Sequence, residues 1–350
     1  MTSPEFYHNK TILVTGGVGS IGSQLVRNLL RFDPASIRVF DNNETGLFDL
    51  EQDLHSPSIR ILIGDVRDKN RVDMAMDGVD IVFHASALKH VPLCEYNPFE
   101  AVKTNVLGTQ NVLEAALRNQ VEKVINISTD KAVNPANVMG ATKLLAERLA
   151  ISANYYKGDK RTVISSVRFG NVLNSRGSVI PLFKNQIREG KCVTVTDTEM
   201  NRFFMDIPSA VNLILTAGRI SRGGEIFILK MPAIRILDLA EVMIEHYAPV
   251  FGFKPDEIPL KIIGKRNGEK LYEDLLTEEE IERVYENEDM FVIVSRSSAA
   301  ENPDDLISPS GDPFDLVVPP GFRRAKRQQY SSKNVPLVDR DRIRDLLKDF

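Results

Sequence analysis

The sequence predicts an α/β fold in which a doubly wound parallel sheet carries helices on both faces. Short apolar stretches recur along the first half of the chain, helical patterns separate most of them, and a glycine-rich turn follows the first. Apolar strands that alternate with helices are typical of parallel sheets. The carboxyl ends of such strands share one edge, where ligands bind.

The elements follow in order along the chain. Strands are predicted at 11–15, 37–40, 61–63, 81–84, 124–127 and 163–167, with helices after Gly22 and at 72–76, 101–117 and 143–155. Beyond about residue 170 the pattern loosens, and it predicts helices at 181–189, 207–220, 236–247 and 269–275 and a strand at 225–229 that rejoins the sheet. We therefore expect a dinucleotide-binding domain at 1–170 and a smaller substrate lobe at 171–350. The Pro-, Asp-, Ser- and Gly-rich segment 301–322 predicts a loop that is either disordered or a lid.

Bulk composition narrows the class of protein. The chain has 350 residues, of which 43% are hydrophobic and 26% charged, as is usual for a globular protein. A net charge of -4 gives no reason to expect nucleic acid as a partner. Cys94 and Cys192 stand far apart, which favours a reducing compartment and buried free thiols. No signal sequence or apolar run of about 20 residues is present, so we expect a cytoplasmic protein that is not in the membrane. We also expect no metal site.

The glycine-rich turn predicts a cofactor site. Gly16, Gly19 and Gly22 stand between a predicted strand and a predicted helix, with Ser20 and Ile21 in the same turn. The first glycine permits the tight turn, the second lets the backbone approach a pyrophosphate, and the third lets the helix pack on the strand. The free N–H groups at the start of the helix then face the phosphates. Glycines also make plain turns, but this context favours a dinucleotide.

Asp41 predicts which dinucleotide binds. It ends the second predicted strand, where a carboxylate accepts hydrogen bonds from the ribose hydroxyls and repels a 2′-phosphate. No Arg or Lys lies in 40–46 to attract that phosphate, so NAD is predicted rather than NADP. A helix N-cap is the alternative role for Asp41.

Two more loops at the same edge are assigned to the cofactor. Asp65 and Val66 follow the third strand, and Asp65 either meets the adenine or makes an Asx-turn. The further residues assigned to the cofactor are Ala85, Ser86, Ala87 and Asn105. Lys89 points toward the substrate edge, whereas His90 is equally explained by structural hydrogen bonds.

These segments together resemble the extended short-chain dehydrogenase/reductase family, and within it the UDP-N-acetylglucosamine 4,6-dehydratases. The likeness runs from about Lys10 to about Val294 and is carried by 15–22, 86–92, 128–133, 167–173, 202–205 and 268–270. Within it, the Thr-Asp-Lys motif of 129–131 is specific to dehydratases. The resemblance implies a Rossmann-type fold, NAD as cofactor, a UDP-sugar substrate and a homo-oligomer.

The same resemblance suggests how the chemistry is divided. Such enzymes usually carry a Tyr four residues before Lys143, but here that position holds Met139, as in the branch that retains the configuration at C5. Some inverting members carry Met as well, and Met139 is equally explained as packing. Lys143 should hold the nicotinamide ribose, Thr129 the C4 oxygen of the sugar.

Asp130 and Lys131 are the candidates for proton transfer. Asp130 is the candidate acid for the leaving C6 hydroxyl if burial keeps it protonated, and Lys131 is the candidate base at C5 if the site depresses its pKa. An ordinary ion pair is the alternative. Either Lys131 or a water held by Asp130 removes the C4 hydroxyl proton.

Cations and amides further along are the candidates for substrate binding. They are Lys89, Met139, Asn171, Arg176, Arg202, Arg266 and Glu269. A guanidinium suits phosphate oxygens, although any single Arg is as well explained by a solvated surface role. Glu269 is assigned to the uridine ribose by resemblance alone.

The sequence therefore predicts NAD-dependent 4,6-dehydration of UDP-N-acetylglucosamine with retention at C5, for surface-sugar synthesis. Three alternatives remain open: a C5-inverting dehydratase, a UDP-sugar 4-epimerase, and a catalytically silent protein that binds NAD as a signal.

Overall fold

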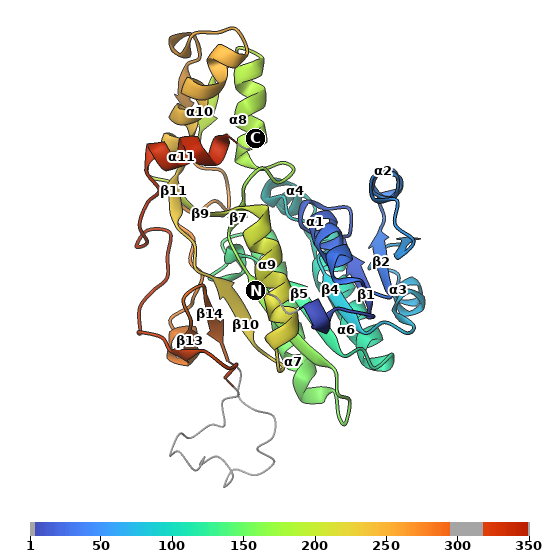
Figure 1. Ribbon diagram of the computed structural model, residues 1–350. Coiled ribbons are helices and arrows are strands. Elements are labelled where there is room, and N and C mark those ends of the chain that lie inside the picture. The colour runs from blue at the N-terminus through green and yellow to red at the C-terminus, as the bar shows by residue number, and fades with distance from the viewer. Residues whose placement is uncertain (1–3, 295–317, 349–350) are drawn as a thin grey trace.

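The computed structural model describes residues 4–294 and 318–348 and confirms the predicted α/β fold (Figure 1). The described residues contain a 10-stranded sheet in the order β15-β13-β14-β10-β6-β5-β4-β1-β2-β3. The parallel strands are β1 (Thr11–Thr15), β2 (Ser36–Asp41), β3 (Ile59–Ile63), β4 (Ile81–His84), β5 (Lys123–Ile127), β6 (Val163–Arg168) and β10 (Ile226–Leu229). The antiparallel strands β14 (Met290–Ile293), β13 (Val284–Glu286) and β15 (Arg323–Arg324) extend one edge.

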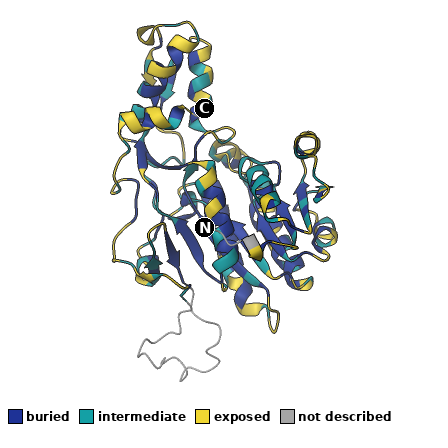
Figure 2. Ribbon diagram, viewed as in Figure 1, coloured by how far each residue is buried: buried dark blue, intermediate teal, exposed yellow. Residues whose placement is uncertain are grey.

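Helices cover both faces of this sheet, so that its strands lie buried between two layers (Figure 2). One layer consists of α1 (Ser20–Leu29), α2 (Glu44–Leu54) and α9 (Ile207–Ile220). The other consists of α3 (Lys69–Met76), α6 (Gly108–Arg118) and α7 (Val138–Tyr156). Beside α7 lie α4 (Val91–Tyr96), α5 (Pro98–Ala101) and a π-helical turn at Val102–Leu107. None of the helices described is long and apolar enough to cross a bilayer.

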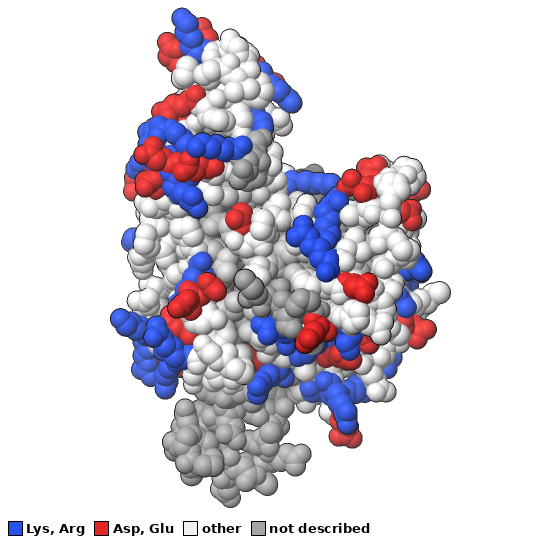
Figure 3. All heavy atoms as spheres, in the orientation of Figure 1, with Lys and Arg blue, Asp and Glu red and all other residues white. Residues whose placement is uncertain are grey.

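A smaller lobe has its own apolar core. It contains α8 (Val179–Arg188), α10 (Ile236–Val250) and α11 (Arg340–Leu347), with β8 (Val193–Val195) paired to β12 (Leu260–Ile262). A three-stranded sheet of β11 (Ala233–Arg235), β9 (Asn201–Met205) and β7 (Asn171–Val172) leads into it. Acidic and basic groups intermingle over α10 and α11 (Figure 3), where Arg340 bonds Glu241 at 2.7 Å and Glu245 at 2.6 Å.

The helix predicted at 269–275 is wrong. The segment is irregular because its backbone groups bond to a distant part of the chain rather than to one another. Leu275 N donates to Tyr330 O at 2.9 Å, and Ser332 N donates to Glu273 O at 2.9 Å. The loop predicted at 301–322 falls largely outside the described residues, which resume at 318.

The order of the strands fixes where a ligand binds. The chain passes from β1 to β2 on one side and later returns to β4 on the other, so the crossovers leave β1 in opposite directions. Ligands of doubly wound sheets lie at this reversal, beyond the carboxyl ends of the strands. The turn after β1 and the loop after β4 meet there.

Candidate active site

The glycine turn between β1 and α1 fits a pyrophosphate. Gly16 has φ 66°, and a Cβ there would lie 2.7 Å from the backbone of Ala85 and Ser86. At Gly22 a Cβ would lie 2.2 Å from the Gly16 carbonyl oxygen. Gly19 is the N-cap of α1 and has no side chain to bond its first N–H groups. The turn therefore brings backbone close to a ligand and leaves helix N–H groups for an anion.

Two cavities of about 510 and about 430 Å³ form one long groove, because they share lining residues. The shared residues are Gly16, Gly19, Ala85, Ala87 and Leu88. One end is lined by Asp41, Asp65 and Val66, and the other by Ser20, Ile21, Thr129, Lys131, Met139, Lys143, Asn171 and Arg176, while Ser86 lies with the first end. This length, with a glycine turn in the middle, fits an extended dinucleotide.

Asp41 lies at the groove but also holds the turn together. Its Oδ2 accepts from Val18 N at 3.2 Å, and its Oδ1 accepts from Asn43 N at 3.1 Å. The N-cap of α2 is Asn43, whose side chain accepts from Gly46 N, so the N-cap alternative for Asp41 is wrong. Each carboxylate oxygen keeps a lone pair for a ribose hydroxyl.

Asp65 makes the Asx-turn considered as its alternative role. Its Oδ1 accepts from Arg67 N at 2.9 Å, and its Oδ2 accepts from the Arg67 guanidinium at 2.6 Å. The hydrogen bond from Arg67 holds the pKa of the Asp65 carboxyl below its usual value. Arg67 also lines the groove, but it is paired with Asp65 and with Glu100, at 2.8 Å, which offsets its attraction for a 2′-phosphate.

Asn105 does not line the groove, contrary to its assignment as a cofactor contact. It is fully buried, and its amide accepts from Leu88 N at 2.7 Å and donates to Leu88 O at 3.0 Å. A third hydrogen bond joins it to Thr142 Oγ1 at 3.0 Å. Asn105 therefore positions the loop after β4, which does line the groove.

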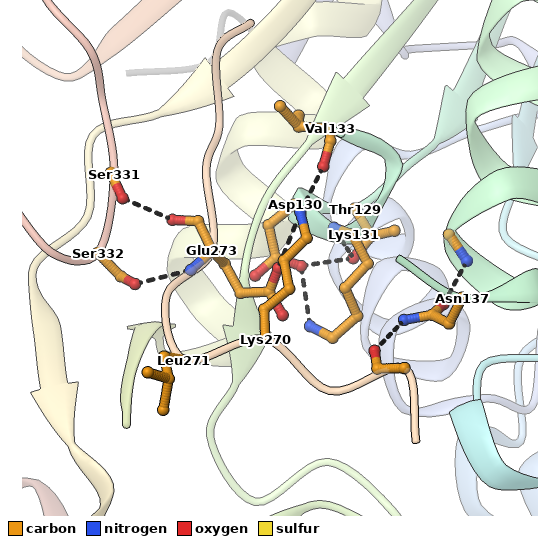
Figure 4. A network of polar contacts seen from close by, with 12 residues as sticks. Thr129, Asp130, Lys131, Val133, Asn137, Lys270, Leu271, Glu273, Ser331 and Ser332 are labelled. Carbon is orange, nitrogen blue, oxygen red and sulfur yellow. Dashed lines mark hydrogen bonds and ion pairs between the residues drawn. The ribbon is translucent and has the colours of Figure 1, made fainter. Parts of the chain in front are cut away.

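The Thr-Asp-Lys motif of 129–131 forms a short turn directly after β5 (Figure 4). Thr129 Oγ1 donates to Asp130 Oδ1 at 2.8 Å, and Lys131 Nζ donates to the same oxygen at 2.9 Å. Lys131 Nζ also donates to Asn171 Oδ1 at 3.2 Å. Asp130 is 0% exposed, so this ion pair lies in an interior that strengthens electrostatic interactions.

Lys131 departs from the expectation in its electrostatics. Burial alone would lower its pKa, but the charge of Asp130, with that of Glu273 when Glu273 is ionised, outweighs burial and raises the pKa above the usual value. The condition set for Lys131 as a base, a depressed pKa, is therefore not met. As a base, Lys131 must first lose a proton that the ion pair holds tightly.

Lys143 and Met139 lie on α7, one helical turn apart, and both line the groove. Lys143 Nζ donates to Ile127 O at 2.6 Å, and burial lowers its pKa to about 8. Met139 is buried, and it packs with Cys94 and Ala101. Met139 thus forms part of the groove wall at the position where such enzymes usually carry a Tyr.

Glu273 is a site residue that sequence reasoning missed. It is 4% exposed, lies on the irregular segment before Leu275, and points toward Asp130 and Lys131 (Figure 4). Burial raises the pKa of Glu273 and the charge of Lys131 lowers it. Burial is the larger effect, so the pKa is raised above its usual value. The sequence signal that could have identified Glu273 was its position three residues after the 268–270 motif. The helix predicted at 269–275 gave no reason to place its side chain in the site.

Lys89, Arg176 and Asn171 meet at the end of the groove that Thr129 and Lys131 line. Lys89 Nζ donates to Arg176 O at 2.6 Å, and Arg176 N donates to Ser20 Oγ at 3.0 Å. The Arg176 side chain itself is exposed at the rim. His90 also lines the groove and packs against Gly177, where a Cβ would lie 2.4 Å from its ring.

Arg202, Arg266 and Glu269 do not line this groove. Arg202 is 7% exposed, and its guanidinium donates to the carbonyls of Asn201, Lys270 and Leu271 at 2.6–3.0 Å. Arg202 therefore holds the Glu273 segment instead of facing outward toward a phosphate. Arg266 is exposed, and its backbone N donates to Glu269 Oε2 at 3.0 Å, so these two lie together on a surface turn.

Comparison with known proteins places the chain among enzymes that modify nucleotide sugars. It is 57% identical over 98% of its length to an uncharacterized membrane protein of Methanocaldococcus jannaschii, of which it covers 97%. A UDP-N-acetylglucosamine 4,6-dehydratase (inverting) of Campylobacter jejuni is 40% identical over 95% of both chains. A protein named UDP-glucose 4-epimerase from Rickettsia canadensis is 45% identical over 81% of this chain and 83% of its own.

Solved structures agree on the fold. Pen from Bacillus thuringiensis matches with a TM-score of 0.88 and 44% identity, and the match covers 99% of each chain. MoeE5, solved with UDP-glucose and NAD, matches with a TM-score of 0.61 and 25% identity over 74% of this chain and 87% of its own.

A family model described as polysaccharide biosynthesis protein matches residues 12–295. That span includes the glycine turn, the Thr-Asp-Lys turn and the segment of Glu273. The chain therefore belongs to the polysaccharide biosynthesis protein family.

Proposed function

We propose that the chain is an NAD-dependent UDP-N-acetylglucosamine 4,6-dehydratase that retains the configuration at C5. The observation that carries this proposal is the ion pair between buried Asp130 and half-buried Lys131, 2.9 Å apart, in which Lys131 lines the dinucleotide groove. The elimination needs a base at C5 and an acid at C6, whereas an epimerisation at C4 needs only a group that exchanges a proton with the C4 oxygen. The Campylobacter jejuni dehydratase, similar along nearly the whole chain, supports the same reaction class.

The groove residues suit NAD in this proposal. The turn at Gly16 and Gly19 would hold the pyrophosphate, Asp41 the adenosine ribose, and the Lys143 ammonium the nicotinamide ribose. Bound NAD supplies a hydride acceptor for C4 and later a hydride donor for C6.

The proton transfers follow from the contacts among three side chains. Thr129 would hydrogen-bond the C4 oxygen, and because it donates to Asp130 at 2.8 Å, it links that oxygen to the carboxylate. The proton released from the C4 hydroxyl passes to Asp130, which gives it to the C6 hydroxyl as the C6–O bond breaks and water leaves. Lys131, once unprotonated, takes the C5 proton and returns it to C5. The proton lost at C4 thus leaves in the water.

A UDP-sugar 4-epimerase is the second candidate, favoured by the Rickettsia canadensis relative. It would share the C4 oxidation but leave the C6 hydroxyl in place.

One experiment tests the proposal: incubation with NAD and UDP-N-acetylglucosamine in D2O, followed by NMR of the products. A UDP-4-keto-6-deoxy sugar with the original C5 configuration is expected. The inverted C5 epimer would refute retention, UDP-N-acetylgalactosamine would identify an epimerase, and unchanged substrate with proven NAD binding would identify a silent binding protein.

A further inference from the structure

Two carboxyl oxygens next to Lys131, which lines the groove, are buried and accept no hydrogen bond. They are Oδ2 of Asp130 and Oε2 of Glu273. A buried polar atom without a hydrogen-bond partner destabilises the folded protein. Besides burial, the charge of Asp130 helps to raise the pKa of Glu273, and Figure 4 shows the two side chains converging from different segments.

The cations around Glu273 direct their hydrogen bonds elsewhere. Lys131 donates to Asp130 and Asn171, and Arg202 donates to backbone carbonyls. Lys270 Nζ lies 4.0 Å from Glu273 Oε2, beyond hydrogen-bond distance, and donates to Val133 O at 2.9 Å. These three cations and Asp130 are the charged groups that act on Glu273.

The backbone of Glu273 is held firmly by a segment far away in the sequence. Ser332 Oγ accepts from Glu273 N at 2.9 Å, and Ser332 N donates to Glu273 O at 2.9 Å. Tyr330 anchors that segment, because its hydroxyl bonds both N and O of Met231. These bonds fix the backbone of Glu273 beside the turn that carries Asp130.

We propose that Glu273 is a protonated positioning residue whose carboxyl O–H donates a hydrogen bond to Asp130 Oδ2. The inference rests on the proposed dehydration. A protonated carboxyl is a donor, so one proton satisfies both unpaired oxygens. Two ionised carboxylates facing each other in a buried site would repel, which favours a proton on one of them.

The proton on Glu273 serves the reaction in two ways. When Asp130 gives its proton to the leaving C6 oxygen, the O–H of Glu273 stabilises the carboxylate that remains, which makes Asp130 the stronger acid. A neutral Glu273 also spares Lys131 a second negative neighbour, which would bind its proton more tightly. Glu273 keeps its own proton throughout.

Infrared difference spectroscopy tests the proton directly. The spectrum of the native protein minus that of Glu273→Gln near neutral pH should show the carbonyl stretch of a carboxylic acid. The exposed Glu279→Gln, on the same segment, should show only carboxylate bands. A carboxylate band in place of the acid band for Glu273 would overturn the proposal. This measurement needs no turnover, so it stands or falls separately from the proposed function.

Enzyme kinetics test the positioning role. Gln at 273 still donates to Asp130, so Glu273→Gln should keep kcat within about 3-fold and leave its pH profile in place, whereas Glu273→Leu should lose about 10- to 100-fold. If Glu273 is ionised, Gln removes a charge that holds the Lys131 proton, and the limb of the profile due to Lys131 moves to lower pH. A shift of that limb to lower pH in Glu273→Gln refutes the inference. So does an equal loss of kcat in Glu273→Gln and Glu273→Leu when NAD affinity is unchanged.

Discussion

The substitution Asp130→Asn tests whether Asp130 carries the proton from the C4 hydroxyl to the C6 hydroxyl. Asp130→Asn keeps an oxygen that accepts from Thr129 and Lys131 but has no proton to give. We expect kcat for dehydration to fall about 10²- to 10⁴-fold, with NAD affinity unchanged. NMR of the products and a fluorescence titration with NAD measure the two. Full turnover would refute the role, and the exposed Asp159→Asn is the control.

Asp41 decides the choice between the two dinucleotides. Asp41→Ala removes the ribose acceptor and the charge that repels a 2′-phosphate, so NAD affinity should fall about 10-fold or more relative to NADP affinity. Asp41→Asn keeps an acceptor for Val18 N, which separates loss of charge from loss of the turn. Equal ratios of the two dissociation constants in all three proteins would contradict the assignment.

Lys143 makes NAD binding depend on pH. Burial lowers its pKa to about 8, below the ordinary value of 10.5, so the ammonium is present at lower pH and is lost as pH rises through about 8. Between these two values the unfolded chain binds the proton more tightly, and the contribution of Lys143 to stability rises with pH. The dissociation constant for NAD should therefore increase from about pH 7 to about pH 9. Lys143→Gln, which can still donate to Ile127, should bind weakly with little change over that range.

For single site residues, the sequence predicts contacts between neighbours in the chain and misses contacts between distant segments. Thr129, Asp130 and Lys131 adjoin one another at a strand end, so their meeting followed from the motif alone. Glu273 meets them only through a segment that Ser332 and Arg202 hold, and no spacing in the sequence reports that contact. Arg202 was assigned to phosphate because a buried Arg and an exposed Arg look alike in a sequence.

Elements are tied together by a buried ionic network around Arg168 of β6. Its guanidinium bonds Glu147 of α7, and it donates to Glu280 at 2.9 Å and to Leu275 O at 2.8 Å. Arg168→Met should cost about 3–5 kcal/mol, because it leaves two carboxylates buried without a partner. Urea unfolding measures this, with the exposed Arg161→Met as control. A loss below about 1 kcal/mol would contradict the expected cost.

Element prediction succeeded where the apolar pattern was regular. The parallel strands and the helix at Ile207–Ile220 carry strong periodicity, and the structure confirms them. The helix predicted at 269–275 failed because long-range hydrogen bonds from Tyr330 and Ser332 override local preference. The short strands β13 to β15 were not predicted. Each forms by pairing with a strand elsewhere in the chain, and local sequence does not report that pairing.

The whole molecule exposes an apolar surface beside α7, which fits the expected homo-oligomer. Tyr96 is 87% exposed and Phe99 78%, and their helices contact α7. Exposed patches of this kind usually mark interfaces. The double variant Tyr96→Asp with Phe99→Asp should reduce the mass measured by sedimentation to that of one chain. Phe48→Asp, on α2 over the opposite face of the sheet, should not; an unchanged mass in the double variant would exclude this surface.

The tie between Glu273 and Ser332 has a consequence for synthesis of the chain. A ribosome makes the groove first, then the Thr-Asp-Lys turn, then Glu273, and only afterwards the serine that holds it. Because Tyr330 and Ser332 follow every strand from β1 to β14, a nascent chain can shape its cofactor groove long before the segment of Glu273 is fixed. A translation product that ends before Tyr330 would therefore carry the groove without the contacts that fix Glu273 beside Asp130.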